Sequence, residues 1–343
     1  MSNQLRWGIV GTGNIARQFT EGVVQSRRGS VVAVGSRSVE SAGAFAERFG
    51  LACSVGDYAA VVSHADVDAV YVALPNNLHH EWTVRALQAG KHVLCEKPMS
   101  GDVASVEAMF DEADRQDRVL IEAFMYRTHP LLQSMKQQIR DGAIGEVKLI
   151  RTSFCFRTGN TTKESNVRFD PDLIGGGLMD IGCYCLDFGQ FITGESPTEV
   201  QAFGHVHQSG VDDVVVGTAK YPGGVLLHFS CGMTVQADNA AHICGDEGYI
   251  EVPVPWKPPV TGAQYSIKQQ LSRPKQDTTA KQEDVSAGPA TITMDSPGHL
   301  YGEEADRFAD VVLDGAEPFM TREESIANIR ALESLRRQIG LSF

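Results

Sequence analysis

The sequence has no apolar run approaching the roughly 18 to 20 residues that a membrane-spanning helix needs. It also lacks low-complexity stretches and internal repeats. Its seven cysteines are odd in number and scattered, with no Cys-x-x-Cys pair, so neither a disulfide framework nor a zinc site is indicated. These absences argue against membrane and repeat architectures and predict a soluble globular protein with reduced thiols.

Positive charge is also scarce. The chain has 30 Lys and Arg against 43 Asp and Glu, a formal net charge of -13, and no basic stripe. This balance argues against a nucleic-acid or membrane partner and favours a small substrate that is uncharged or neutralised locally. Residues 1–13 contain one arginine and no signal-type cleavage pattern, so we expect a cytoplasmic protein.

What the sequence does have is enough apolar material for about two domains, at 343 residues and 42% hydrophobic composition. We predict an α/β protein with a dinucleotide-binding domain over residues 1–123 and a substrate-binding and dimerisation domain over 124–343. The first should be a doubly wound parallel Rossmann sheet of about six strands. The second should be an α+β domain with a large, open, mostly antiparallel sheet.

The first domain is indicated by a glycine-rich turn after an apolar strand at residues 5–10. The turn reads Gly11-Thr12-Gly13-Asn14-Ile15-Ala16 and precedes a helix-compatible stretch, 17–26. In this context Gly11 allows the tight turn, Gly13 lets the backbone approach a pyrophosphate, and Ala16 lets helix pack on strand. The helix N-terminus then favours the anion.

The next strand, 31–35, indicates which dinucleotide is bound. It ends in Ser36-Arg37-Ser38, where an NAD-preferring enzyme would usually carry an acidic residue for the ribose 2′-hydroxyl. A hydroxyl with a guanidinium suits a 2′-phosphate, so NADP is predicted, with NAD as the alternative. On the other interpretation, Arg37 is simply a solvated loop residue.

Two further strand ends carry candidate ligand-binding residues. Strand 67–74 ends at Leu74 and is followed by Pro75 and Asn76, which can face a ribose, and by His79, which is more often a capping or packing residue. Strand 91–95 ends in Glu96-Lys97-Pro98, where proline stops the strand. Because ligands bind beyond the carboxyl ends of parallel strands, Lys97 is the first candidate for chemistry.

In the second half, Gly175-Gly176-Gly177 precedes a helix that carries Asp180 and Tyr184, four residues apart. A phenol near an ammonium has its charged form stabilised, so a Lys97–Tyr184 pair could move a proton near neutral pH. Otherwise Asp180 would cap the helix and Tyr184 would be a core residue. The polar stretch 158–172, which contains Arg168, has the character of a lid.

The remainder predicts mostly antiparallel strands at 148–156, 199–207, 213–221, 225–234, 241–245 and 248–254. Residues 253–288 are expected to be irregular. Helices are predicted over 303–313 and from Thr321, whose Thr-x-x-Glu sequence is a capping box, to about Gly340. His205 and His207 would share a strand face but lack a third ligand, so no metal site is predicted.

These motifs, in this order and spacing over the whole chain, resemble the glucose-fructose oxidoreductase, inositol dehydrogenase and MocA-like family. The run 122–127 and Tyr184 are most similar to the branch of trans-dihydrodiol dehydrogenase and NADP-dependent D-xylose dehydrogenase. Inositol dehydrogenases carry histidine where this chain has Tyr184, a departure that argues against an inositol substrate.

The resemblance implies that Lys97 binds the nicotinamide ribose and substrate, Tyr184 is the acid/base, and Asp180 orients a substrate hydroxyl. Arg168 and Arg127 would lie near the nicotinamide. The predicted catalytic residues are thus Lys97, Tyr184 and Asp180; the predicted coenzyme-binding residues are Gly11, Thr12, Gly13, Asn14, Ile15, Ser36, Arg37, Leu74, Pro75, Asn76, His79, Glu96, Lys97 and Arg168.

The activity so predicted is an NADP-dependent oxidoreductase acting on an aldose or related cyclic hydroxy compound, working as a homodimer or a dimer of dimers. Two alternatives remain. One is a glycoside hydrolase or lyase that retains NAD and works by transient oxidation, and the other is a regulator that binds NADPH without turnover.

Overall fold

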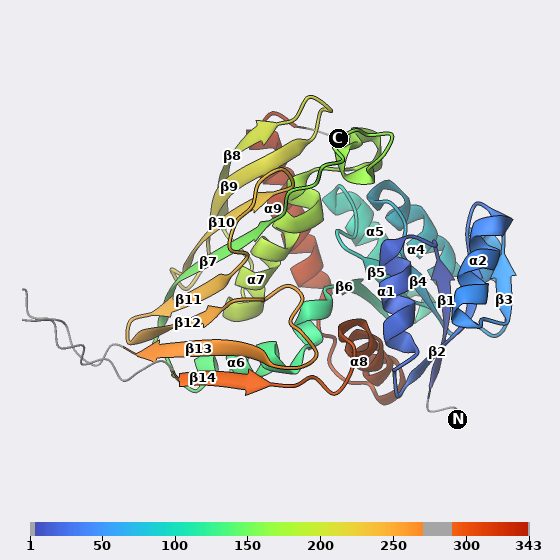
Figure 1. Ribbon diagram of the computed structural model, residues 1–343, viewed down its shortest axis with the longest axis horizontal. Coiled ribbons are helices and arrows are strands. Elements are labelled where there is room, and N and C mark those ends of the chain that lie inside the picture. The colour runs from blue at the N-terminus through green and yellow to red at the C-terminus, as the bar shows by residue number, and fades with distance from the viewer. Residues whose placement is uncertain (1–3, 270–289, 342–343) are drawn as a thin grey trace, which may run out of the picture.

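A computed structural model of the chain describes residues 4–269 and 290–341. In the described part, two β-sheets stand apart with helices between and around them (Figure 1). Across those residues, no helix combines the length and the apolar character needed to span a bilayer.

The first sheet is parallel throughout, as the sequence predicts. Its strands are β1 (Leu5–Val10), β2 (Gly29–Gly35), β3 (Cys53–Val55), β4 (Ala69–Val72), β5 (His92–Glu96) and β6 (Leu120–Ala123). Their order is β3-β2-β1-β4-β5-β6, which places the change of winding direction between β1 and β4. Ligands bind at such a switch point in doubly wound sheets.

The helices of the first half connect these strands. They are α1 (Asn14–Val23), α2 (Val39–Phe49), α3 (Tyr58–Val62), α4 (His79–Gln88) and α5 (Val103–Gln116), with the 3₁₀ turn η1 (Asn76–Leu78). The boundaries of α2 follow from its sequence, because the Ser38 side chain caps the first turn and Gly50 ends the helix in a left-handed conformation. The sequence analysis missed β3 and α3, which are too short to show a period.

The second sheet is mostly antiparallel, again as predicted. Its strands are β7 (Val147–Cys155), β8 (Glu199–Val206), β9 (Asp212–Lys220), β10 (Leu226–Gly232), β11 (Ala241–Gly245), β12 (Gly248–Val252), β13 (Ala263–Gln269) and β14 (Ala290–Met294). Their order is β14-β13-β12-β11-β7-β10-β9-β8, and only the β7–β10 pair is parallel within the described sheet.

The prediction of an irregular stretch over 253–288 is wrong in part. Residues 263–269 form β13, which pairs with β12 on one side and β14 on the other. Tyr265 is fully buried and its hydroxyl contacts Ser134, so this strand is held by the core. Residues 270–288 of the predicted stretch lie outside the described residues.

The helices of the second half are η2 (Met125–Thr128), α6 (Pro130–Arg140), η3 (Val167–Phe169), η4 (Pro171–Leu173), the π-helical turn η5 (Leu178–Gly182), α7 (Cys183–Thr193), α8 (Leu300–Asp314) and α9 (Arg322–Gln338). The predicted capping box at Thr321 is present. In Figure 1, α7 and α9 lie on the side of the second sheet that faces the first, and the outer side carries none of the described helices.

Helix α8 returns to the first sheet and packs on α1. A Cβ placed on Gly22 would lie 2.5 Å from the Gly302 nitrogen, so the two helices meet at backbone distance. The rings of Trp7 and Phe308 are 5.1 Å apart, and the Arg28 amide donates to Asp306 at 3.0 Å. Residues near the start of the chain and residues 300–314 therefore pack together beside the first sheet.

Candidate active site

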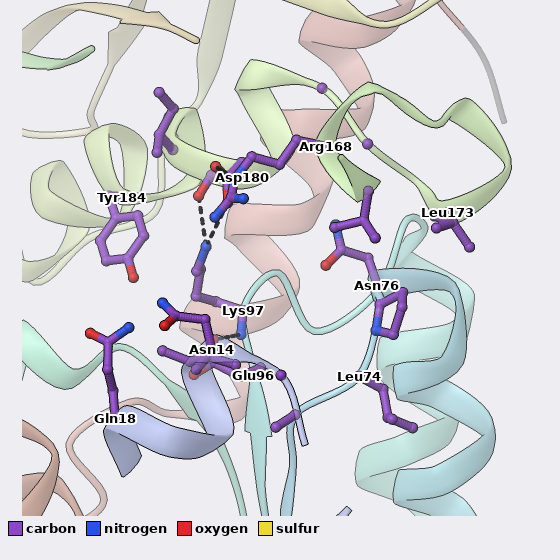
Figure 2. A pocket seen from close by; sticks show the side chains of 18 of the residues that line it. Asn14, Gln18, Leu74, Asn76, Glu96, Lys97, Arg168, Leu173, Asp180 and Tyr184 are labelled. Carbon is purple, nitrogen blue, oxygen red and sulfur yellow. Dashed lines mark hydrogen bonds and ion pairs between the residues drawn. The ribbon is translucent and has the colours of Figure 1, made fainter. Parts of the chain in front are cut away.

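A cavity of about 610 Å³ lies between the two sheets, outside the carboxyl ends of β1, β4 and β5 (Figure 2). Both halves of the chain supply its wall. The lining residues are Gly13, Asn14, Ile15, Gln18, Ala73, Leu74, Pro75, Asn76, Glu96, Lys97, Phe154, Phe156, Val167, Arg168, Leu173, Gly175, Gly176, Asp180, Ile181, Tyr184, Lys257 and Tyr301.

The glycine-rich turn after β1 forms the floor of the cavity. Gly11 has φ +108°, and a Cβ there would lie 2.4 Å from the Ala73 carbonyl oxygen, so only glycine fits. Gly13 has open space where a Cβ would project, and α1 begins directly after it. Gly13, Asn14 and Ile15 line the cavity, whereas Gly11 and Thr12 are not part of its wall.

The end of β2 lies outside the cavity wall. Ser36 is buried and its hydroxyl accepts a hydrogen bond from Thr12 at 3.3 Å, which joins the first turn to the second strand. Arg37 is exposed beside it. Its predicted role at a 2′-phosphate stays a prediction.

The end of β4 supplies Leu74, Pro75 and Asn76 to the cavity, as predicted. The Asn76 side chain donates to the Ile174 carbonyl at 2.9 Å, which connects this turn to the second half of the chain. His79 does not line the cavity. Its two ring nitrogens lie 2.8 Å from the carbonyl oxygens of Leu74 and Pro98, and burial lowers the pKa of the ring to about 4. His79 therefore connects the segment after β4 to the segment after β5 without lining the cavity.

Asp180 joins Lys97 and Arg168 in a charge cluster. Lys97 Nζ donates to the Asp180 carbonyl oxygen at 2.7 Å and to Oδ1 at 3.3 Å, while Arg168 Nε donates to Oδ2 at 2.6 Å (Figure 2). Burial alone would lower the pKa of Lys97, but Asp180, together with Cys183 and Glu96, raises it overall. Burial alone would raise the pKa of Asp180, but Lys97 and then Arg168 hold it below its usual value.

Tyr184 lies beside this cluster. The Lys97 ammonium is 5.0 Å from the centroid of the phenol ring, and the hydroxyl contacts the Met125 sulfur at 3.4 Å. Burial raises the pKa of Tyr184 well above its usual value, and Tyr301 and Glu96 act in the same direction. The expectation that the ammonium would bring this phenol near neutral pH is therefore wrong for this structure, because burial outweighs it.

Glu96 lines the cavity from the end of β5. The carboxylate accepts from the Tyr71 hydroxyl and, at 3.2 Å, from the Lys97 backbone amide. Burial raises its pKa, and the charge of Lys97 offsets part of the rise. This carboxyl group thus fixes the turn that carries Lys97.

Arg127 is not at the cavity, contrary to the expectation from the family resemblance. It is buried beside α7, where Nε and Nη2 donate to the two carboxylate oxygens of Asp187 at 2.9 and 2.6 Å. The Tyr126 hydroxyl donates to the same carboxylate at 2.5 Å. None of these three residues lines the cavity, although the Tyr126 ring lies 6.0 Å from the ring of Tyr184, which does.

Sequence reasoning missed several lining residues, chiefly Phe154, Lys257 and Tyr301 with the neighbouring Trp256. The Trp256 indole donates to the Ser153 carbonyl at 2.8 Å, and its ring stacks on Phe154 at 5.5 Å. The available signal was the aromatic residue at the end of strand 148–156. Which residues of the second sheet face the cavity depends on register, which the sequence leaves open.

The described residues, 4–269 with 290–341, contain no group of three or more His, Cys, Asp or Glu side chains that could hold a metal ion.

A doubly wound sheet with this turn, facing a second sheet across such a cavity, has the architecture of a dinucleotide-binding Rossmann domain joined to a second domain. Residues 5–124 match the GFO/IDH/MocA oxidoreductase family, described as having an NAD-binding Rossmann fold, and residues 132–251 match the GFO/IDH/MocA C-terminal domain. The chain belongs to this family, which confirms the predicted membership.

Its relatives include mouse trans-1,2-dihydrobenzene-1,2-diol dehydrogenase, which is 34% identical over 257 residues, 74% of this chain and 76% of the relative. A Haloferax volcanii protein named D-xylose 1-dehydrogenase (NADP(+)) 2 is 28% identical over 333 residues, 96% of each chain. These two names confirm the predicted resemblance to the dihydrodiol and D-xylose dehydrogenase branch.

Two solved structures resemble the whole fold. A 3-ketoreductase from Actinomadura kijaniata, in complex with NADP and TDP-benzene, matches with a TM-score of 0.85 at 28% identity and 98% coverage of both chains. Aldose-aldose oxidoreductase from Caulobacter crescentus, complexed with glycerol, matches with a TM-score of 0.84 at 27% identity and the same coverage. The predicted fold class is confirmed.

Proposed function

We propose that this protein is an NADP-dependent oxidoreductase that interconverts a hydroxyl and a carbonyl group on an aldose or a related cyclic hydroxy compound. The observation that carries the proposal is that one cavity brings the glycine-rich turn at Gly13 together with Lys97, Asp180 and Tyr184. The relatives named for sugar and dihydrodiol substrates support the substrate class.

The residues present fit a dinucleotide. The space where a Gly13 Cβ would project is empty of protein, and it faces the first turn of the ten-residue helix α1, whose free backbone amides favour a phosphate. Gly13, Asn14 and Ile15 would hold the pyrophosphate, and Leu74, Pro75, Asn76 and Glu96 would line the ribose and nicotinamide. A bound nicotinamide supplies or accepts the hydride.

The preference for NADP rests on Ser36 and Arg37 and on the relatives named with NADP. In the variant Arg37→Asp the guanidinium gives way to a carboxylate, which repels a 2′-phosphate and can accept a hydrogen bond from a 2′-hydroxyl. We expect the dissociation constant for NADPH to rise and that for NADH to fall or stay unchanged, measured by fluorescence titration. Equal effects on both coenzymes would contradict this assignment.

In the direction of reduction, Tyr184 donates its proton to the substrate oxygen. Its raised pKa keeps the phenol protonated, which is the form a proton donor needs. The Lys97 ammonium over the ring would stabilise the phenolate left behind. Asp180, held ionised by Lys97 and Arg168, would accept a hydrogen bond from a neighbouring substrate hydroxyl and so orient the substrate.

We further propose that residues 1–123 and 124–343 act as the coenzyme and substrate domains, and that two copies associate through the outer face of the second sheet. Phe203 of β8 is 83% exposed and lies opposite Val216 of β9, which is 51% exposed, on this face. Light scattering should give twice the chain mass for the wild type and a monomer for Phe203→Lys. A monomeric wild type would contradict it.

The thiols fit a reducing compartment such as the cytoplasm. All seven cysteines are free, and five of them are buried.

The activity is tested by following NADPH oxidation and NADP⁺ reduction against a panel of pentoses, hexoses, dicarbonyls and cyclic diols. We expect turnover with at least one class and its loss in Lys97→Met. If NADPH binds but no member of the panel reacts, the non-catalytic regulator gains support. If NAD stays bound through purification and glycosides are cleaved, the hydrolase alternative gains support.

A further inference from the structure

One corner of the cavity plays no part in the chemistry above. It is formed by Gln18 of α1, Lys257 from the segment after β12, and Tyr301 of α8, and we call it the Lys257 corner. Lys257 Nζ donates to Gln18 Oε1 at 3.3 Å and lies 5.9 Å from the centroid of the Tyr301 ring.

The Lys257 corner carries an ammonium that forms no ion pair with a carboxylate of the described residues, although the more distant Glu96 favours its charged form. The other two cations that line the cavity, Lys97 and Arg168, both pair with Asp180. Lys257 has no carboxylate within 4.0 Å in the described part of the chain, and its hydrogen bond goes to a neutral amide. The cavity therefore offers one ammonium to a ligand.

The Tyr301 ring lines the same corner, and its hydroxyl is a buried donor without a partner among the described residues. The residue is 2% exposed, and its hydroxyl has no hydrogen-bond partner among residues 4–269 and 290–341. Burial raises the pKa of Tyr301 well above its usual value, with Glu96 and Glu304 acting in the same direction, so the phenol keeps its proton. A buried donor without a partner is unfavourable, and a ligand acceptor would satisfy it.

The segment that carries Lys257 is anchored. Trp256 immediately before it is held by the hydrogen bond to Ser153 and by stacking on Phe154, and prolines at 255 and 258 restrict the backbone on both sides. The backbone that carries the Lys257 side chain is therefore held in place, and the residue itself is exposed to solvent.

We propose that the Lys257 corner binds a carboxylate or phosphate group of the substrate, so that the preferred substrates are anionic hydroxy compounds such as sugar acids or sugar phosphates. The Lys257 ammonium pairs with the anion and the Tyr301 hydroxyl donates to one of its oxygens. This inference deepens the proposed function and rests on it for the identity of the reacting group.

An anion of the coenzyme is the other source of the same chemistry, and the geometry favours the substrate. The coenzyme phosphates have their own donors at the start of α1, beside Asn14. Gln18 lies a full helical turn farther along, about 6 Å at 1.5 Å per residue. Figure 2 shows Gln18 on the Tyr184 side of Asn14, with Leu74 and Asn76 on the opposite side.

The test compares matched probes that differ in charge: D-glucose against D-glucuronate and D-glucose 6-phosphate. Binding to the NADP⁺-loaded protein is measured by calorimetry, which needs no turnover, and kcat/KM is measured wherever a probe reacts. The variants are Lys257→Gln, which keeps length and removes charge, and Tyr301→Phe, which keeps the ring. Lys148→Gln, at an exposed lysine on β7 paired with Glu146, is the matched control.

We expect the wild type to bind at least one anionic probe about tenfold or more tightly than glucose, as a charge-assisted contact allows. Lys257→Gln should remove most of that preference, Tyr301→Phe a smaller part, and Lys148→Gln none. Added salt should weaken the anionic probes more than glucose.

The proposal is overturned if neither anionic probe binds more tightly than glucose. It is also overturned if Lys257→Gln weakens NADPH binding and leaves the probes unchanged, which would assign the corner to the coenzyme. The proposed function fails separately: a charge preference in binding with no turnover of any panel compound would sink the oxidoreductase activity and leave the corner standing.

Discussion

Two clusters of similar composition lie on one continuous helical run, and the first lines the cavity whereas the second is buried in the protein. At the start of the run, Asp180 holds Lys97 and Arg168, with Tyr184 alongside. Seven residues later, Asp187 holds Arg127, with the Tyr126 hydroxyl bonded to the same carboxylate. We call these the cavity cluster and the sealed cluster.

The pKa values of the two aspartates differ in direction. In the cavity cluster two cations outweigh burial and lower the pKa of Asp180. In the sealed cluster burial dominates and raises the pKa of Asp187, although Arg127 opposes it. The sealed cluster also ties Arg127 to Glu324 at 2.9 Å and to the Phe319 carbonyl at 3.0 Å, so it fastens α7 to the start of α9.

The difference shows how one helix serves two purposes. The side chains of the cavity cluster line the cavity, where a ligand can replace some of the contacts that they make with one another. Those of the sealed cluster are satisfied by the protein alone, and they fix the helix on which Asp180 and Tyr184 are placed. Substitutions in the first should therefore change turnover, and substitutions in the second should change stability.

The largest difference between the effect on turnover and the effect on stability is expected for Tyr184→Phe. Loss of the proposed proton donor should lower kcat by about 10²- to 10⁴-fold. The free energy of unfolding should change little, because the hydroxyl contacts only the Met125 sulfur among the described residues. Steady-state kinetics and urea unfolding of the same preparation check both halves. A variant with nearly full turnover would remove Tyr184 from the chemistry.

Arg127→Met should give the reverse pattern. It leaves the Asp187 carboxylate buried without its cation, which costs about 3–5 kcal/mol in comparable cases. The double variant Arg127→Met/Asp187→Leu should recover much of that loss in chemical denaturation. If the double variant is no more stable than the single one, the charge pair is not what holds α7 in place.

Tyr126→Phe is the matched partner of the first substitution. It removes a hydrogen bond to a buried carboxylate, for which about 1–3 kcal/mol of unfolding free energy is expected. Turnover per folded molecule should stay close to that of the wild type. A fall in kcat as large as that of Tyr184→Phe would erase the distinction between the two clusters.

The smallest effect is a pH dependence of stability in the cavity cluster. The folded pKa of Asp180 lies below its reference value of 3.8. The ionised group therefore stabilises the fold above about pH 4, and this contribution disappears as the pH falls through the folded pKa. Urea midpoints of the wild type and Asp180→Asn from pH 6 down to pH 3 should converge. A difference that grows towards low pH would contradict the sign.

The sequence predicted those parts of the cavity that are set by short local patterns. The turn at Gly11 and Gly13 and the strand ends at Asn76 and Lys97 carry their signals within a few residues, and the parallel sheet brings them together by topology. The alternating strands of the second sheet were predicted for the same reason.

The parts that were missed depend on contacts over long separations. Strand β13 is defined by pairing with its neighbours rather than by its own composition, and Lys257 reaches the cavity because Trp256 is held by Ser153, 103 residues earlier. The pKa of Tyr184 could not be read from a nearby lysine, because its direction is decided by how completely the ring is enclosed.

The packing of α8 on α1 has a consequence for how the protein folds while it is being synthesised. Trp7 and Gly22 find their partners in residues 300–314, so a chain still emerging from the ribosome lacks this packing until those residues have been synthesised. The coenzyme-binding half, although encoded first, is finished late, and during that interval its uncovered apolar flank is where a chaperone would be expected to bind.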